Sequence, residues 1–207
     1  MSVNGTPQDR FIKIGDIIDI LHEHLTAAMC GAAFQKVRTA ERQREWSLFH
    51  LVRFWTAVVL KAPPSLTMAL EECRQGRQGL LPEVRASAPA FFQRCRDMSP
   101  EFFVEVFARF IKSILPEAPC AYASDLTSLR ERFKEVWIID ASRLAKVAHR
   151  LKILRNIKEA VLPGCLTVCY DLFRGIAREI AYSTDAAESE HRRAEEMIPN
   201  IPKGTLL

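Results

Sequence analysis

The feature that most constrains the fold is a short apolar run, residues 136–139, that ends on the carboxylate of Asp140. The run is rich in β-branched and aromatic residues and has polar neighbours on both sides, which is typical of a strand buried on both faces. Asp140 is therefore expected at the strand's end, where its oxygens are open to a cation, as a metal-dependent phosphoryl-transfer site requires. The alternative is a loop aspartate that caps the following element.

Composition describes a globular protein that has no membrane partner. The 207 residues are 48% hydrophobic and 26% charged, which allows one large domain or two small ones. A formal charge of +4 suits an anionic partner but does not identify one. The most apolar run, residues 54–60, is too short to span a bilayer, and no signal peptide is apparent. We therefore expect a cytoplasmic location.

The 6 cysteines lack the spacing of a zinc site, since neither a Cys-x-x-Cys pair nor a His-x-x-x-His pair occurs. They are predicted to be small buried hydrophobic residues in a reducing compartment. The cysteines are Cys30, Cys73, Cys95, Cys120, Cys165 and Cys169.

The first part of the chain, residues 1–133, shows helical periodicity. Apolar positions recur at helical spacing over 16–31, 34–61 and 124–133. The basic start of the second helix, followed by a turn and a short helix, resembles a DNA-binding arrangement, although any small helical bundle has the same outline. The serines placed to cap further helices are Ser65, Ser87 and Ser99.

The pattern changes to strands after Lys134. Residues 136–140 are predicted as a first strand, 164–172 as a second, and 176–183 as a third that pairs antiparallel with the second across the turn at 173–175. Three strands in this order form the start of a sheet.

A helix is predicted after these strands. Asp185 and Glu188 have the spacing of a capping box, so the helix should begin at Asp185 and run to about Met197. A turn then leads into another apolar run at 205–207. The predicted fold class is α+β, with an all-helical region over 1–133 followed by the start of a sheet and a helix over 134–207.

A basic segment connects the first and second strands. Its cations face a single acid, Glu159. Such clusters are usually solvated surface, but next to a catalytic carboxylate they are well placed to hold a DNA backbone, and both interpretations stay open. The cations are Arg143, Lys146, Arg150, Lys152, Arg155 and Lys158.

Several short motifs resemble the insertion-sequence-four type of DDE transposase. The resemblance covers the last third of the chain, and upstream there is only a helical region of the expected kind. The order strand, basic connection, hairpin, helix and further strand resembles the opening of a ribonuclease-H-like fold. The motifs are Ile138-Ile139-Asp140-Ala141-Ser142-Arg143-Leu144, Leu162-Pro163-Gly164, Tyr170-Asp171-Leu172 with Gly175, Asp185-Ala186-Ala187-Glu188-Ser189-Glu190 and Pro202-Lys203-Gly204-Thr205-Leu206-Leu207.

The resemblance implies a catalytic and metal-binding role for Asp140. Members of the family often have Gly and then Ser or Thr after this aspartate, whereas this chain has Ala141 and Ser142. The complete enzyme would use Mg²⁺ or Mn²⁺, and its second aspartate and its glutamate have no counterpart in these 207 residues. Because a two-metal site needs several carboxylates, we expect this chain alone neither to bind metal stably nor to cut or join DNA. Asp171 and Asp185 are expected to make local hydrogen bonds instead.

Three functions follow from these observations. The first is a truncated DNA transposase, in which 1–133 serves DNA recognition or dimerisation and 134–207 is the first part of the catalytic domain. Its partners would be double-stranded DNA at transposon ends and a possible second copy in a homo-oligomer. The second is a non-catalytic DNA-binding or interaction protein that occupies transposon ends or pairs with full-length transposase. The third is a helical adaptor unrelated to DNA, in which Asp140 only caps a strand.

Overall fold

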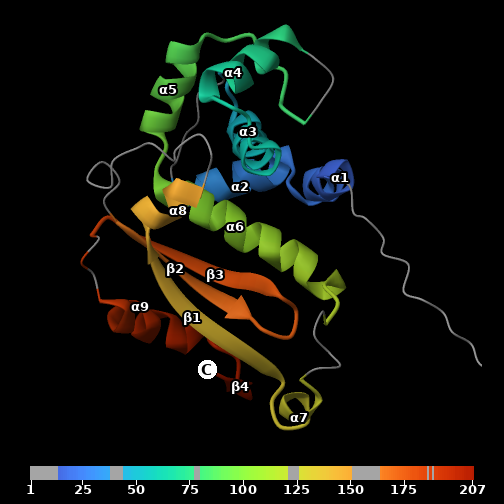
Figure 1. Cartoon of the computed structure of the whole chain (residues 1–207), viewed down its shortest axis with the longest axis vertical. Coiled ribbons are helices and arrows are strands. Elements are labelled where there is room, and N and C mark those ends of the chain that lie inside the picture. The colour runs from blue at the N-terminus through green and yellow to red at the C-terminus, as the bar shows by residue number, and fades with distance from the viewer. Residues whose placement is uncertain are drawn as a thin grey trace, which may run out of the picture.

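The computed structural model of the chain describes residues 14–37, 44–76, 80–120, 126–150, 164–185, 187 and 189–207. Helices α1–α5 gather at one end of the molecule and the sheet lies at the other, with α6 between them (Figure 1). The predicted α+β class is confirmed. The elements are α1(Ile14–His24), α2(Ala27–Val37), α3(Leu48–Lys61), α4(Leu66–Gln75), α5(Ala88–Asp97), α6(Pro100–Ile114), η1(Leu115–Glu117), α7(Thr127–Arg130), β1(Glu135–Arg143), α8(Leu144–Arg150), β2(Cys165–Asp171), β3(Ile176–Ser183), α9(Glu190–Met197), η4(Ile198–Asn200) and β4(Thr205–Leu206).

Serine caps define where several helices begin. The hydroxyl of the capping serine accepts a backbone N–H of the first turn, which satisfies a donor that has no partner within the helix. The three predicted caps are confirmed, and a fourth serine caps α3. The capping residues of α3, α4, α5 and α6 are Ser47, Ser65, Ser87 and Ser99.

Two predicted helices were wrong in their bounds. The helix predicted over 16–31 is broken at Thr26, whose hydroxyl accepts the N–H of Met29 at 3.1 Å and starts α2. Gly31 consequently lies inside α2 and not at a helix end. The helix predicted over 34–61 was also wrong, because α2 ends at Val37 and the Ser47 cap starts α3 at Leu48.

Aromatic rings organise the core at the helical end. Phe54 and Phe91 are fully buried with ring centroids 4.7 Å apart, and the Trp46 ring lies 4.8 Å from that of Phe91. Each buried ring of this size contributes about 2 to 3 kcal/mol through its apolar area. Helix α6 adds the fully buried Phe102 to this core and packs against α2 and β3. It therefore joins the helical end to the sheet.

The sheet has the strand order β3-β2-β1-β4. β1 pairs antiparallel with β2, β2 pairs antiparallel with β3, and β4 pairs parallel with β1 through Glu135 and Val136. The predicted hairpin between the second and third strands is confirmed, as is a further strand at Thr205. With β4 the sheet has four strands, whereas the sequence predicted the three-stranded start of a sheet and an apolar run at 205–207 entering another strand.

The first strand differs from its prediction in length and in burial. It continues to Arg143, so Asp140 lies within the strand and not at its end, because the ladder with β2 extends to the pair Arg143 and Cys165. It is also not buried on both faces, since Ile138 is 48% exposed. Helix α9 packs on the other face of β1 through Met197, next to Trp137.

The helix after β3 begins later than predicted. The Asp185 carboxylate accepts the N–H of Ala187 at 2.8 Å, a local turn that competes with a helix start at this position. Helix α9 begins at Glu190 after Ser189. Glu188, the other half of the predicted capping box, lies outside the described residues.

Candidate functional site

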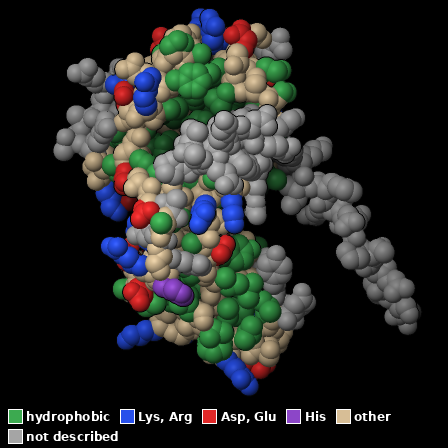
Figure 2. All heavy atoms as spheres, turned by 60° about the vertical axis from the view of Figure 1, so that its left-hand side comes forward, with side chains coloured by type: hydrophobic (Ala, Val, Ile, Leu, Met, Phe, Trp, Pro, Cys, Tyr) green, Lys and Arg blue, Asp and Glu red, His purple; other side chains and the backbone are tan. Residues whose placement is uncertain are grey.

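Asp140 lies on the open face of the sheet. It pairs with Val168 of β2, and because side chains alternate along a strand it shares its face with Ile138 and Ser142. The residue is exposed, and no hydrogen bond or ion pair joins its carboxylate to another described residue. The residues of β2 opposite Ile138, Asp140 and Ser142 are Tyr170, Val168 and Leu166. Figure 2 shows a broad group of hydrophobic side chains on the lower half of the molecule in that view. Asp140 is thus an accessible carboxylate on a largely apolar face.

The surroundings of Asp140 do not fit a complete two-metal centre. Mg²⁺ prefers six oxygen ligands, and two cations need several bridging carboxylates. Within the part of the chain that the structure describes, no three Asp, Glu, His or Cys side chains converge on a common point. The cross-strand neighbour Val168 and the strand neighbour Ile138 are apolar. Asp140 can therefore supply one ligand position and no more.

Asp171 lies on the face of the β1–β2 ladder opposite to that of Asp140. It pairs with Trp137 of β1, and residues 137 and 140 of a strand point to opposite faces. Asp171 is fully buried. Its carboxylate accepts the backbone N–H of Arg174 at 3.1 Å and ion-pairs with the guanidinium groups of Arg174 at 2.9 Å and Arg178 at 3.4 Å. The predicted local role of Asp171 is confirmed, as is that of Asp185 in its own turn.

Glu135 completes this buried ion network. It accepts a hydrogen bond from Trp137 Nε1 at 2.8 Å and lies 3.4 Å from Arg174 and 3.6 Å from Arg178. The Arg178 guanidinium also lies 5.1 Å from the Trp137 ring centroid. Burial acts to lower the pKa of Arg174, but its hydrogen bond with Asp171 and the two carboxylate charges outweigh burial and raise it. Two acids and two arginines neutralise each other here, so the network is structural.

The sequence analysis missed the two arginines of this network. The position of Asp171 at the start of a turn was a usable signal for its bond to the Arg174 backbone, because an aspartate there often bonds to the backbone just ahead of it. Arg178 had no such signal. Its side chain reaches the covered face through a register shift in the β2–β3 ladder between Cys169 and Tyr170.

The predicted DNA-binding residues are only partly described. Arg143 ends β1 and Lys146 lies in the first turn of α8; both are exposed, and no ion pair joins either to another described residue. The structure thus brings two cations to the corner between β1 and α8, close in sequence to Asp140. Arg150 ends α8, and its side chain is not described. The predicted positions Lys152, Arg155 and Lys158 lie outside the described residues.

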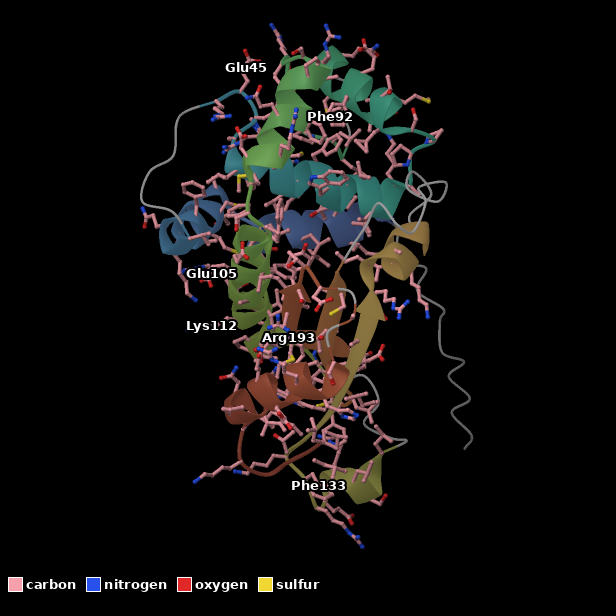
Figure 3. All side chains as sticks on the ribbon, turned by 90° about the vertical axis from the view of Figure 1, so that its left-hand side faces the viewer. Glu45, Phe92, Glu105, Lys112, Phe133 and Arg193 are labelled. Atoms are coloured by element: carbon pink, nitrogen blue, oxygen red, sulfur yellow. The ribbon has the colours of Figure 1, made fainter. Side chains whose placement is uncertain are left out.

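A hollow of about 380 Å³ lies at the helical end, where Arg44, Trp46 and Arg94 contribute to its lining. Its lining residues lie within 44–46 and 86–94, so none belongs to the sheet. Figure 3 shows one of them, Glu45, at the opposite end of the molecule from Phe133. The hollow is therefore separate from Asp140, which sits on an open surface.

The comparisons leave the family of the chain open. No protein-family model, no curated protein and no solved structure matches it. Among the described helices, none combines the length and the apolar character that a membrane crossing needs.

Proposed function

We propose that this chain is the first part of a DDE transposase of the insertion-sequence-four type, with Asp140 as its first catalytic carboxylate. The observation that carries the proposal is the sheet. Strands β1, β2 and β3 form an antiparallel series, β4 pairs parallel on the other side of β1, and Asp140 lies on β1. A ribonuclease-H-like sheet begins with this order and these directions. Fold alone does not define function, so the argument for DNA binding and catalysis depends on the residues of β1 and α8.

Exposed cations that follow Asp140 in the sequence support contact with double-stranded DNA. Arg143 and Lys146 have no carboxylate partner among the described residues, so their charges are available to phosphates. A phosphate contact positions DNA without reading its sequence. Recognition of transposon ends, or dimerisation, would then belong to the helical region over 1–133.

Two-metal catalysis requires several carboxylates, and the described residues bring no group of three metal-binding side chains together. In the complete enzyme Asp140 would contribute one ligand to Mg²⁺ or Mn²⁺, and the metal would activate the attacking oxygen. Alone, the purified chain should neither cleave nor join DNA when magnesium or manganese is added. A strand-transfer assay checks this, and turnover by the purified chain would refute the lone-carboxylate interpretation.

A non-catalytic DNA-binding or interaction protein, which occupies transposon ends or pairs with full-length transposase, is the second candidate, because the exposed cations Arg143 and Lys146 would serve it equally well. The nucleotide sequence after the Leu207 codon separates the two candidates. An in-frame continuation with an aspartate after the next strand and a distant glutamate favours the enzyme, whereas a stop codon with retained binding of transposon ends favours the second candidate.

A mobility-shift experiment tests the DNA interaction that both candidates share. Both predict a shift of double-stranded DNA at low salt that weakens at moderate salt, because cations are released from DNA when phosphates are contacted. Lack of a shift under both conditions would contradict both candidates and favour a helical adaptor unrelated to DNA.

A further inference from the structure

A second group of exposed cations surrounds α7, at the start of β1. Three of them come from residues 130–134 and the fourth from the turn before β4. All four are exposed, and no ion pair joins any of them to another described residue. We call this group the α7 cluster; it consists of Arg130, Arg132, Lys134 and Lys203.

Backbone contacts bring the two segments of the α7 cluster together. The N–H of Lys134 donates to the carbonyl of Gly204 at 3.0 Å, and an added Cβ on Gly204 would lie 3.5 Å from Lys134 Cδ. Lys203 is the direct neighbour of Gly204, so the two lysines leave the backbone at neighbouring points. The N–H of Phe133 donates to the carbonyl of Leu129 at 2.8 Å, which keeps the two arginines of the cluster within one helical turn.

The α7 cluster has an excess of positive charge. The only acid within 126–134 and 202–204 is Glu131, which is exposed as well. The carboxylate of Glu135, next in the chain, is already bound to Arg174 and Arg178. Like charges that lie close together repel each other, and an anion placed among them relieves this repulsion. The cluster is therefore suited to an anionic partner.

The α7 cluster and the corner between β1 and α8 lie at opposite ends of β1 (Figure 1). β1 has 9 residues, and a strand rises about 3.4 Å per residue, so the two groups of cations are about 27 Å apart along it. Each strand of a DNA duplex carries a phosphate about every 3.4 Å. A duplex of about eight base pairs consequently reaches both groups, whereas a small anion reaches only one.

We propose that the α7 cluster is a second phosphate-binding surface for double-stranded DNA, so that one duplex lies along β1 and contacts cations on both sides of Asp140. The inference rests on the proposed function and adds to it the direction of the DNA axis relative to the sheet. The exposed carboxylate of Asp140 repels phosphates, so a duplex along this strand needs cations on both sides of it.

The side chains of the α7 cluster fit this role. Arginine has a planar group of N–H donors that can bind two phosphate oxygens at once, and lysine adds a point charge. Contacts of this kind fix the position of the DNA backbone and do not read its sequence. The cluster therefore orients the duplex and does not select it.

The salt dependence of DNA binding by the full chain tests this proposal. The triple variant Arg130→Gln, Arg132→Gln and Lys203→Gln removes three charges and keeps the side chains polar. Lys134 is retained because its side chain packs beside Gly204. In fluorescence anisotropy with a labelled duplex of about 20 base pairs, the slope of log affinity against log salt should be smaller by about 2.7, because each lost phosphate contact reduces it by about 0.9.

The control variant removes three cations of the helical end that already have carboxylate partners. It loses the same total charge, and its slope should stay at the wild-type value. A wild-type slope in the α7 variant, or an equal loss of slope in the control variant, would overturn the proposal. The control substitutions are Lys61→Gln, Arg74→Gln and Arg85→Gln, whose partners are Glu72, Glu71 and Glu83.

Two further results separate this inference from the proposed function. If the wild-type chain binds DNA and only the double variant Arg143→Ala and Lys146→Ala loses slope, the inference fails and the proposed function stands. If the wild-type chain binds no DNA, both fail.

The number of duplexes bound per chain tests the common axis. A duplex of about 12 base pairs is long enough to reach both groups of cations, so one duplex should bind per chain. Two duplexes per chain would show that the two groups bind DNA separately and would overturn the proposal.

Discussion

Asp140 and Asp171 lie on opposite faces of the same two-stranded ladder, and their surroundings differ completely. Asp140 is exposed and has no partner among the described residues, whereas Asp171 is fully buried and held by Arg174 and Arg178. A carboxylate that is free to bind a ligand and one that stabilises the fold are therefore distinguished by the face on which each lies.

Removing the buried carboxylate should destabilise the protein strongly. In Asp171→Ala, Arg174 and Arg178 lose their main partner while still partly buried, with 25% and 12% of their side chains exposed. A cost of about 3 kcal/mol in the free energy of unfolding is expected. Asp140→Ala is the matched control, since it removes an exposed carboxylate and should change the free energy of unfolding by less than about 0.5 kcal/mol. Urea unfolding measures both, and similar losses in the two variants would contradict the assignment of faces.

The contact between α2 and α6 should weaken in acid. Glu105 accepts from Lys36 at 2.7 Å and from Arg109 at 2.8 Å. Burial acts to raise the pKa of Glu105, but the hydrogen bonds and charges of Lys36 and Arg109 outweigh it and lower the pKa from 4.5. A lowered pKa means that the stabilisation is complete above pH 4.5 and is lost as the pH falls through the lowered value.

Glu105→Gln tests this expectation. Above pH 5 or so the variant should be less stable than the wild type by about 1 kcal/mol, and the difference should shrink as the pH falls. Thermal unfolding as a function of pH measures the difference. Glu131→Gln, which changes an exposed carboxylate, is the control and should show no such trend. A difference that stays constant down to pH 3 or so would show that the ion pairs of Glu105 do not stabilise the contact.

Two glycines should respond oppositely to alanine. Gly164, just before β2, has a φ of +112°, and an added Cβ would lie 2.3 Å from the carbonyl oxygen of Ser183. Gly164→Ala should therefore cost about 2 kcal/mol or more. Gly31 lies inside α2, where an added Cβ would meet nothing within 4 Å, so Gly31→Ala should stabilise by about 0.5 to 1 kcal/mol. Denaturant unfolding gives both values, and the same sign for both would contradict the backbone geometry.

Three buried cysteines should resist alkylation in the folded protein. Burial raises the pKa of Cys30, Cys73 and Cys169 to about 11. At pH 8 only about one thiol in a thousand would then be ionised, and the thiolate is the reactive form. Mass spectrometry after brief treatment with iodoacetamide should find the half-buried Cys120 labelled before these three. Labelling of Cys30 at the rate of the unfolded chain would contradict the packing of α2.

Local features of the sequence predicted much of the helical end and the hairpin. Ser65, Ser87 and Ser99 each cap a helix through a bond within three residues, so the neighbouring sequence is sufficient to place these helix starts. The turn before Ile176 is likewise local, because Gly175 adopts a φ of +70° there. Helix caps and tight turns, which are set by residues within about three positions of each other, depend little on the remainder of the fold.

Features that depend on distant contacts were predicted poorly. The end of β1 is set by pairing with β2 as far as Cys165, which the residues after Asp140 do not reveal. The exposure of Ile138 depends on α9 covering only the opposite face. The neutralisation of Asp171 by Arg178 requires the register shift in the β2–β3 ladder. Sequence patterns identified Asp140 as a candidate, but its surroundings follow from tertiary structure.

The central claim, that the corner between β1 and α8 holds DNA phosphates, can be tested by the salt dependence of DNA binding. Fluorescence anisotropy with a labelled duplex between about 50 and 200 mM salt should give a smaller slope of log affinity against log salt for the double variant Arg143→Ala and Lys146→Ala, by about 1.8 if each cation contacts one phosphate. Arg74→Ala, which removes a cation already paired with Glu71, should leave the slope unchanged. A double variant that binds with the wild-type slope would contradict the claim.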